Sequence, residues 1–285
     1  MIVKKHQTKA LTVAILLLAA ATLQACSSGG KLDGNDLVAQ MKSNKVLEIG
    51  TSNDVPWSSV SSSGAAVGII PDILREYFKR AGLSDVKMTS TPMPFDSLIP
   101  SLTSGRIQLI GDAIFDTKAR EKQVQFTQTT FYNAEALVVA KGNPKHISSL
   151  TDLCGKSAAT YKGTSWVQDL QTASSKCTSG SIKLTTYDTV DQVIQDIANG
   201  RVDGGLIDSS ISAYAISKNP SLKIELASGY VPLSRSSSNN ALAVPLADTS
   251  FVKSFNQYYA EMLADGTVAK IFEENGLKPA KVWLP

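Results

Sequence analysis

The chain has 285 residues, 43% hydrophobic and 19% charged, with 28 basic and 25 acidic side chains. This is the composition of an ordinary globular protein, with enough apolar residues for two cores. Three of the 28 basic residues, Lys4, Lys5 and Lys9, lie in the first nine positions, and the first 25 residues contain no acid. If that segment is removed, 25 basic residues face 25 acidic ones, so a basic, nucleic-acid-binding protein is excluded.

The N-terminus has the pattern of an export signal. After the three lysines comes the apolar stretch ALTVAILLLAAATL, and small residues follow it. The stretch has about 14 residues, whereas a membrane-spanning helix needs about 20. We therefore predict that residues 1–25 are a signal peptide that is removed on export.

The tetrapeptide LQAC spans the end of the predicted signal peptide, and Cys26, its fourth residue, is the first residue after the signal. This tetrapeptide resembles the lipobox of bacterial lipoproteins, in which the cysteine is acylated, although Gln24 is not the usual small residue. The polar stretch SSGGKLDGND follows, and residues 26–44 are predicted to be a lipid-anchored tether. The protein is then expected in the periplasm or at the cell surface, held to a membrane. A plain signal peptide that happens to end near a cysteine is the alternative.

The predicted elements then alternate between strand and helix. Residues 46–51 are predicted to form the opening strand, residues 71–82 a helix and residues 86–91 a second strand. The helix has Pro71 and Asp72 in its first turn, and a stripe of apolar residues on one face. Alternation of this kind is typical of an α/β protein.

One helix–glycine–strand unit occurs twice, about 95 residues apart. The two glycine-containing stretches are SGRIQLIGD at 104–112 and NGRVDGGLID at 199–208, and each follows a segment with helical apolar spacing. Glycine at the end of each helix accepts a left-handed backbone conformation without steric cost. The units end in Asp112 and Asp208, each at the carboxyl end of a predicted strand. Two similar α/β lobes explain the repeat, although a single such unit is common in any α/β protein.

The rest of the chain places one lobe inside the other. Turn residues near 142 mark a boundary, and residues 239–246 are predicted to be a strand that returns to the first lobe. We predict that lobe 1 comprises residues 45–140 and 241–285, and lobe 2 residues 141–240. Extended crossings near 137–142 and 240–245 are expected to form the hinge.

Cys154 and Cys177 are the remaining cysteines. In an exported protein such a pair is expected to form a disulfide, although a free pair is the alternative. The closed loop of about 24 residues would contribute roughly 3 kcal/mol by the chain-entropy model.

The order of motifs resembles one protein family from about residue 45 to 276. The motifs include PFDSLIPSLTSGRIQLI, T-x-x-R, SLTDLCGK, the turn KGTS, NGRVDGGLID and the terminal ADGTVAKIFEENG. Together they are similar to solute-binding protein family 3, the amino-acid-binding components of bacterial ABC transporters. The resemblance implies a periplasmic-binding-protein-like (type II) fold whose two lobes close on a free amino acid. It also implies a monomer that delivers its ligand to a membrane permease, without a cofactor.

The resemblance assigns ligand contacts to individual residues. Arg120 matches the arginine that binds the ligand carboxylate, and Asp208 matches the aspartate that binds the ammonium. A guanidinium group binds a carboxylate at two points, which lysine cannot do. The alternatives are a solvated surface arginine and a helix-capping aspartate.

Further contacts are expected around these two charges. Thr164 and Ser165 lie in the KGTS turn before a helix, where N–H groups attract an anion. Phe95 matches the aromatic residue over the ligand side chain, with core packing as the alternative. Asp54 lies in the first loop and is expected in the pocket. Asp112, Asp116 or the carbonyl group of Ala113 is expected to hold the ammonium in place of the hydroxyl that the family has at position 115.

Two positions depart from the family pattern. Phe115 stands where the family has Ser or Thr, and Ile70 where an acidic residue is common. The ligand is therefore expected to be an amino acid or a derivative with a modified amine, and the sequence does not identify it.

Catalysis is not expected. His146 is the only histidine after the predicted signal peptide, and no hydrolase, metalloprotease or phosphate-loop motif occurs. No Cys/His cluster predicts a metal site. The alternatives are a dehydratase of the same fold, which would use pocket carboxylates, and an exported ligand-sensing module.

Overall fold

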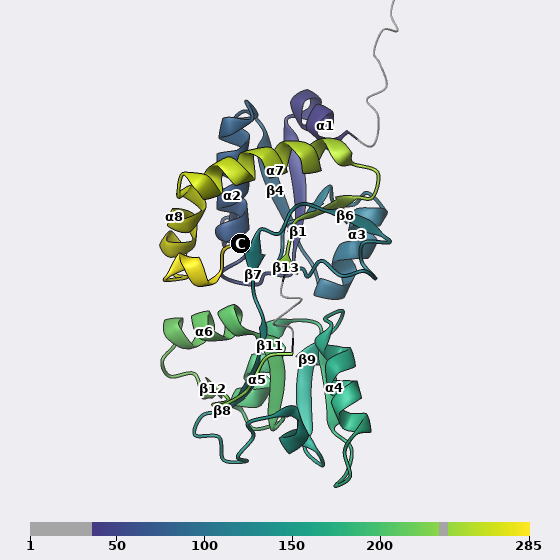
Figure 1. The fold of residues 1–285 in the computed structure, drawn as a ribbon, viewed down its shortest axis with the longest axis vertical. Coiled ribbons are helices and arrows are strands. Elements are labelled where there is room, and N and C mark those ends of the chain that lie inside the picture. Colours follow the sequence, from purple (N-terminus) through teal and green to yellow (C-terminus); the bar gives the residue numbers. More distant parts are fainter. Residues whose placement is uncertain (1–35, 234–238) are drawn as a thin grey trace, which may run out of the picture. The chain divides into compact units, whose positions relative to one another are not determined.

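The computed structural model describes residues 36–233 and 239–285. The predicted signal peptide and Cys26 lie outside these residues. The described chain contains two five-stranded sheets, which are coloured by sequence in Figure 1. No helix in the described ranges is long and apolar enough to cross a membrane.

The first sheet has the strand order β4-β1-β5-β14-β6. Its strands are β1 (Val46–Thr51), β4 (Lys87–Pro92), β5 (Leu109–Ile110), β6 (Val124–Phe126) and β14 (Ala243–Pro245). β1 pairs in parallel with β4 and β5, whereas β14 is antiparallel to β5 and β6. The helices of this part are α1 (Leu37–Asn44), α2 (Ile69–Arg80), α3 (Leu98–Thr103), α7 (Thr249–Ala264) and α8 (Thr267–Glu274), with the 3₁₀ turns η1 (Phe95–Ser97) and η3 (Ala280–Val282).

The second sheet has the order β10-β9-β11-β8-β12. Its strands are β8 (Glu135–Ala140), β9 (Ser157–Tyr161), β10 (Lys183–Tyr187), β11 (Gly204–Asp208) and β12 (Ile224–Leu226). β9 is parallel to β10 and β11, and β8 is antiparallel to β11 and β12. The helices of this part are α4 (Trp166–Ser175), α5 (Val190–Ala198) and α6 (Ser209–Lys218), with the 3₁₀ turn η2 (Leu150–Leu153).

Two short ribbons complete the strands of the described chain. β2 (Ser59–Val60) pairs with β3 (Ala66–Val67), and β7 (Phe131–Tyr132) pairs with β13 (Asn239–Asn240), both antiparallel. In the sequence, β7 lies between β6 of the first sheet and β8, the first strand of the second sheet. β13 lies on the return path, so the two crossings of the chain are hydrogen-bonded to each other.

The two copies of the repeat end their helices in the same way. Gly105 and Gly200 have φ angles of 76° and 68°. The N–H of Arg106 donates to the carbonyl of Ser101, and the N–H of Arg201 to that of Asp196, both at 2.9 Å. This six-residue bond closes the carbonyl end of a helix around a left-handed glycine. The predicted repeat is therefore a structural repeat, and each copy leads into a buried strand of a different sheet.

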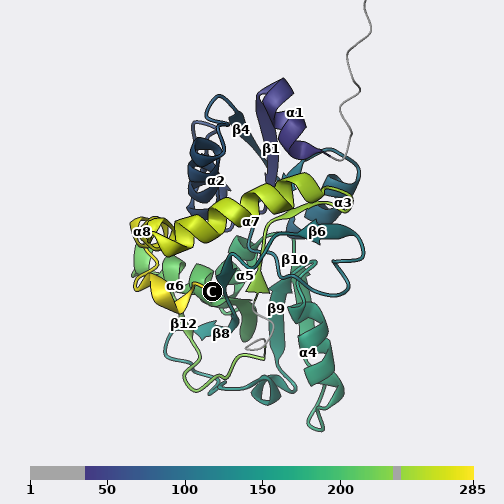
Figure 2. The same ribbon diagram turned by 45° about the horizontal axis from the view of Figure 1, so that its top comes forward.

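The start of the chain differs from the prediction for residues 26–44. Residues 37–44 form α1, which is not a tether. Asp36 accepts a hydrogen bond from the N–H of Ala39 at 2.8 Å, and Leu37 and Met41 are buried one helical turn apart. The N–H of Leu37 also donates to Asp248, which lies at the start of α7. α1 packs on α7, and α8 on α2 (Figure 2).

The first predicted crossing was misplaced, and the second overlaps the observed return path only at residues 240–242. Residues 136–139 are buried apolar residues of β8, which pairs within the second sheet, and residues 243–245 form β14 of the first sheet. The chain therefore leaves the first sheet between residues 126 and 135 and returns between 226 and 243. A run of consecutive apolar residues belongs in a sheet buried on both faces, which is why β8 cannot serve as an exposed hinge. The other lobe boundaries remain predictions.

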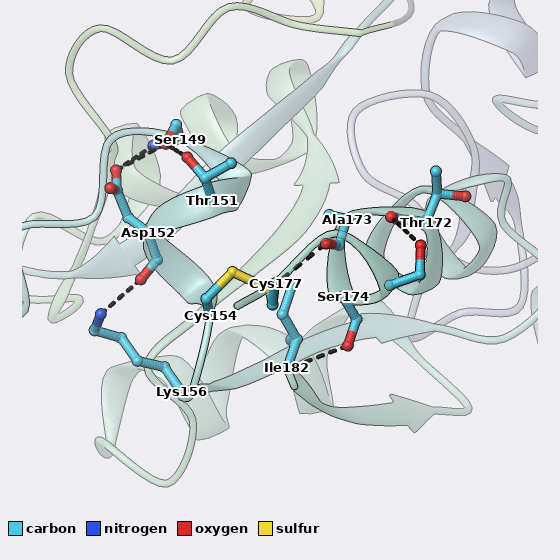
Figure 3. The surroundings of a disulfide bond; sticks show 11 residues. Ser149, Thr151, Asp152, Cys154, Lys156, Thr172, Ala173, Ser174, Cys177 and Ile182 are labelled. Atoms are coloured by element: carbon cyan, nitrogen blue, oxygen red, sulfur yellow. Dashed lines mark hydrogen bonds between the residues drawn. A yellow bond between two sulfur atoms is a disulfide. The ribbon is translucent and has the colours of Figure 1, made fainter. Parts of the chain in front are cut away.

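The predicted disulfide between Cys154 and Cys177 is present, with a Cα–Cα distance of 5.4 Å. It joins Cys154, which follows η2, to Cys177, the second residue after α4 (Figure 3). Nearby, the Ser174 hydroxyl accepts a hydrogen bond from the N–H of Ile182 at 2.9 Å. The disulfide therefore fixes the C-terminal end of α4, opposite Trp166 at the start of the helix.

Candidate functional site

A cavity lies at the carboxyl ends of strands from both sheets. Some lining residues follow β4 and β5 of the first sheet, and the others lie at or after the ends of β9 and β11 of the second sheet. The lining residues are Phe95, Ala113, Phe115, Arg120, Tyr161, Thr164, Ser165, Trp166 and Asp208. Loops at the carboxyl ends of parallel strands gather at one edge of a sheet, where ligands of α/β proteins bind. The topology therefore brings together residues that are up to 113 positions apart in the chain.

The space between the lining atoms is about 220 Å³, including the part that opens to solvent, and the centre of a water molecule has about 10 Å³ in which to move. That is room for about one water molecule. A ligand of amino-acid size therefore requires the lining to move apart.

Arg120 spans the cavity between loops of the two sheets. Its Nη1 donates to the carbonyl of Phe115 at 2.9 Å, and its Nη2 to the carbonyl of Gly163 at 3.0 Å. The guanidinium lies 5.4 Å from the ring centre of Phe95, and it forms no salt bridge with any described residue. Burial lowers the pKa of Arg120 to about 10, so the group stays charged at neutral pH. It is a cation without an anionic partner in the described chain.

Asp208 supplies the opposite charge. It ends β11 and is 2% exposed. Tyr161 donates to its Oδ2 at 2.7 Å, and the side-chain amide of Asn133 donates to Oδ1. Burial raises the pKa of Asp208 to about 7, and the charges of Asp112 and Glu135 act in the same direction. The side chain makes no capping hydrogen bond to α6, so the alternative role as a helix cap is not observed.

Aromatic rings form much of the cavity wall. Phe95 meets Tyr161 edge to face at 5.8 Å, Tyr161 meets Trp166 at 5.6 Å, and Trp166 meets Phe115 at 6.1 Å. All four rings are at most 7% exposed. Rings in edge-to-face contact hold one another in fixed orientations. The wall is therefore apolar and shaped, with the two charged groups set into it.

Two more carboxyl groups lie close to Asp208. Asp112 is fully buried and accepts hydrogen bonds from the hydroxyl of Ser52 at 2.8 Å and from the N–H of Ala113 at 2.7 Å. Burial raises the pKa of Asp112 to about 6. Burial also raises the pKa of Asp54 strongly, and the charges of Asp112 and Asp208 add to the effect. Three acidic side chains thus share one poorly solvated region, which favours the arrival of a cation.

The start of α4 faces Arg120. The hydroxyl of Thr164 donates to the carbonyl of Tyr161 at 2.9 Å, and Ser165 precedes the helix without forming a side-chain cap. Gly163 has a φ angle of 79°, and a Cβ atom there would lie 2.7 Å from the Cα of Asp96. Only glycine lets this turn approach the segment after Phe95 so closely. The turn KGTS is therefore a point of close approach between the two halves.

The structure brings most of the predicted site residues together. Those that line the cavity are Phe95, Ala113, Arg120, Thr164, Ser165 and Asp208. Asp54 does not line it: the residue is 1% exposed, and its Oδ2 has no hydrogen-bond partner in the described chain. Ile70 is a buried residue of α2 and does not reach the cavity.

Sequence reasoning missed the residues that support the site. Asn133 bonds to Asp208 from the crossing that follows β7, and Ser52 bonds to Asp112 from the loop after β1. Trp57, which lies in the same loop as Asp54, does not line the cavity; it stacks on Phe131 at 3.7 Å and donates to the hydroxyl of Ser210 at 2.8 Å. Neither Asn133 nor Ser52 belongs to a motif, so only the tertiary structure reveals them.

The described ranges contain no group of three or more His, Cys, Asp or Glu residues arranged to hold a metal ion. The side chains that line the cavity offer one guanidinium, one carboxyl group, hydroxyl groups, one indole N–H and aromatic faces. This set suits recognition of a small molecule that carries both charges.

The chain resembles known proteins in its sequence and in its fold. The sequence pattern of the bacterial extracellular solute-binding proteins, family 3, matches residues 47–278. The probable amino-acid-binding protein YxeM of Bacillus subtilis (strain 168) is 26% identical over 263 residues, which cover 92% of this chain and 93% of that protein. ABC transporter arginine-binding protein 1 of Escherichia coli (strain K12) is 27% identical over 219 residues, covering 77% and 85%.

A solved structure of an ancestral arginine-binding protein bound to arginine superposes with a TM-score of 0.72 and 28% sequence identity. The match covers 81% of this chain and 98% of that one. With the family pattern matched from β1 to the residues after α8, the chain belongs to the bacterial extracellular solute-binding proteins of family 3.

Proposed function

We propose that this protein is the extracytoplasmic substrate-binding component of an ABC importer, and that it binds a free amino acid or a similar zwitterion between two lobes. One observation carries the proposal: Arg120 and Asp208 line the same cavity. A zwitterion brings a carboxylate for the first and an ammonium for the second. The relatives named above, which are amino-acid-binding proteins, support the same ligand class.

The ligand carboxylate would bind the free N–H groups of Arg120 and the hydroxyls of Thr164 and Ser165. The ammonium would bind Asp208, with the carbonyl of Ala113 as a further acceptor. Phe95 would cover the ligand side chain. Asp54 does not line the cavity, so we assign it no direct contact with the ligand.

Binding would use a change between open and closed arrangements. With room for about one water, the cavity has to open to admit an amino acid. Because Arg120 already bonds to Gly163 across the cavity, a ligand held by both walls favours the closed arrangement. The closed protein would then dock on its membrane permease as a monomer.

The proposal includes export and attachment to a membrane through acylated Cys26. The N-terminal sequence pattern supports it. Mass spectrometry of the mature protein tests it: a mature chain that begins at an acylated Cys26 is expected, whereas an unmodified N-terminus would contradict the anchor.

We propose binding without turnover. The relatives named above are amino-acid-binding proteins, which supports binding as the role of this chain. Incubation of the purified protein with its ligand should give stoichiometric binding and no product. Product formation would favour the enzyme alternative.

A thermal-shift screen tests the proposed function. The twenty L-amino acids and common betaines are each added to the purified protein, since a ligand that binds the folded state raises Tm by mass action. Calorimetry then measures the stoichiometry for the compound with the largest shift. One site per chain is expected, and the absence of a shift with every compound would contradict the proposal.

A further inference from the structure

One hydrogen-bond donor in the cavity wall has no acceptor. Trp166 is 2% exposed, and its indole Nε1 forms no hydrogen bond within the described chain. Indole N–H can only donate, and burying it without an acceptor costs free energy of folding. Trp166 lines the cavity, so an acceptor that enters the cavity can reach this wall.

Trp166 and Arg120 both lie beside Phe115 and the KGTS turn. The ring of Trp166 lies edge to face on Phe115 at 6.1 Å, and Arg120 bonds to the carbonyl of Phe115 at 2.9 Å. Arg120 also bonds to the carbonyl of Gly163, which is three residues before Trp166. Both residues therefore line the part of the cavity that Phe115 and the KGTS turn form.

We propose that the indole N–H of Trp166 donates a hydrogen bond to the carboxylate of the bound amino acid, beside the guanidinium of Arg120. The inference rests on the proposed function and adds a specificity-determining residue to it. A hydrogen bond to an ionised acceptor is stronger than one between neutral groups. The group that Trp166 selects for is thus an anionic oxygen, not an apolar or cationic one.

The other two tryptophans provide internal controls. Trp57 already donates to Ser210 at 2.8 Å, so its N–H is satisfied without ligand. Trp283 also has a buried Nε1 without a partner in the described chain, but it does not line the cavity. It packs edge to face on Trp57 at 6.4 Å. Trp283→Phe therefore removes an equivalent N–H at a place where the ligand cannot reach it.

The first experiment is calorimetry on Trp166→Phe, Trp283→Phe and the parent protein. The probe is the L-amino acid that raises Tm most in the screen of twenty. Trp166→Phe keeps an aromatic ring and loses the donor, so its Kd should rise about tenfold or more, while its Tm without ligand is kept or raised. Trp283→Phe should bind like the parent. Equal affinity of Trp166→Phe and the parent would overturn the inference.

The second experiment does not require a variant that folds. The three tryptophans give three indole N–H resonances in an NMR spectrum of the ¹⁵N-labelled parent. On saturation with the same amino acid, the Trp166 resonance should move downfield and exchange more slowly with solvent, while those of Trp57 and Trp283 change less. An unchanged Trp166 resonance at saturation would overturn the inference. If no amino acid binds the parent protein at all, the proposed function fails, and the inference fails with it.

Discussion

Nη2 of Arg120 donates to the carbonyl oxygen of Gly163 at 3.0 Å, and this bond joins a loop of the first sheet to a loop of the second. A second bond, from Nη1 to Phe115, fixes the guanidinium within its own loop. Of the five N–H groups of arginine, about three remain for a ligand. The same side chain can therefore bind a carboxylate, and its hydrogen bond to Gly163 forms only when the two loops lie together.

The first prediction concerns this guanidinium. Arg120→Ala should lower affinity for the amino-acid ligand by about 2–5 kcal/mol, because it leaves the ligand carboxylate buried without its cation. Calorimetry measures the loss. Arg201→Ala is the matched control, since Arg201 pairs with Asp196 on the surface and its side chain is 70% exposed. Binding of Arg120→Ala at the affinity of the parent would show that the assigned role is wrong.

The second prediction concerns Asp208. Asp208→Asn keeps the shape of the side chain and removes its negative charge, so an amine-bearing ligand should lose about tenfold or more in affinity. The analogue of that ligand without the amine should lose much less. Competition calorimetry with the pair measures the difference. An equal loss for both compounds would argue against an ammonium contact.

The third prediction is a pH dependence of stability. The pKa of Asp208 is about 7 in the folded protein, against 3.8 for an ordinary aspartate. The stability that its protonated form contributes is complete below about pH 4 and is lost as the pH rises through about 7. Without ligand, Tm of the parent should therefore fall more over this range than Tm of Asp208→Asn. Parallel curves for the two proteins would contradict the raised pKa.

The fourth prediction is the corresponding pH dependence of binding. An ammonium ligand favours ionised Asp208, so affinity should rise with pH from about 5 to about 7, by at most roughly tenfold per pH unit for this one group. Asp208→Asn should show a weaker rise. The buried carboxyl of Asp112, with its pKa raised to about 6, contributes in both proteins, which is why the comparison is needed. Affinity that falls as the pH rises would exclude an ammonium contact in this cavity.

The fifth prediction separates the disulfide from the site. Replacement of both Cys154 and Cys177 by alanine should lower the free energy of unfolding by about 3 kcal/mol, because the unfolded chain regains the conformational entropy that the closed loop had removed. Ligand affinity should stay near that of the parent, since the bond fixes the end of α4 opposite Trp166. Chemical denaturation and calorimetry measure the two quantities. A large loss of affinity with unchanged stability would reverse this assignment.

The amino-acid sequence by itself determined many of the helices and strands and the two charged residues Arg120 and Asp208. Apolar spacing and a glycine predict α3 and α5 with their left-handed ends, because these depend on contacts within about one helical turn. The repeated aspartates follow the same logic, since Asp208 ends the buried strand β11 and Asp112 lies two residues after the buried strand β5. Arg120 and the disulfide were predicted from the order of motifs and from the number of cysteines.

Only the tertiary structure decided which residues share a cavity and which belong to each sheet. β8 was expected in the first lobe, but its strand pairing is a long-range property that an apolar run does not encode. α1 was expected to be a tether, and its burial depends on α7, more than 200 residues away. The unpartnered N–H of Trp166 is the extreme case. Whether a donor has an acceptor depends on every surrounding atom, and no spacing in the sequence reports it.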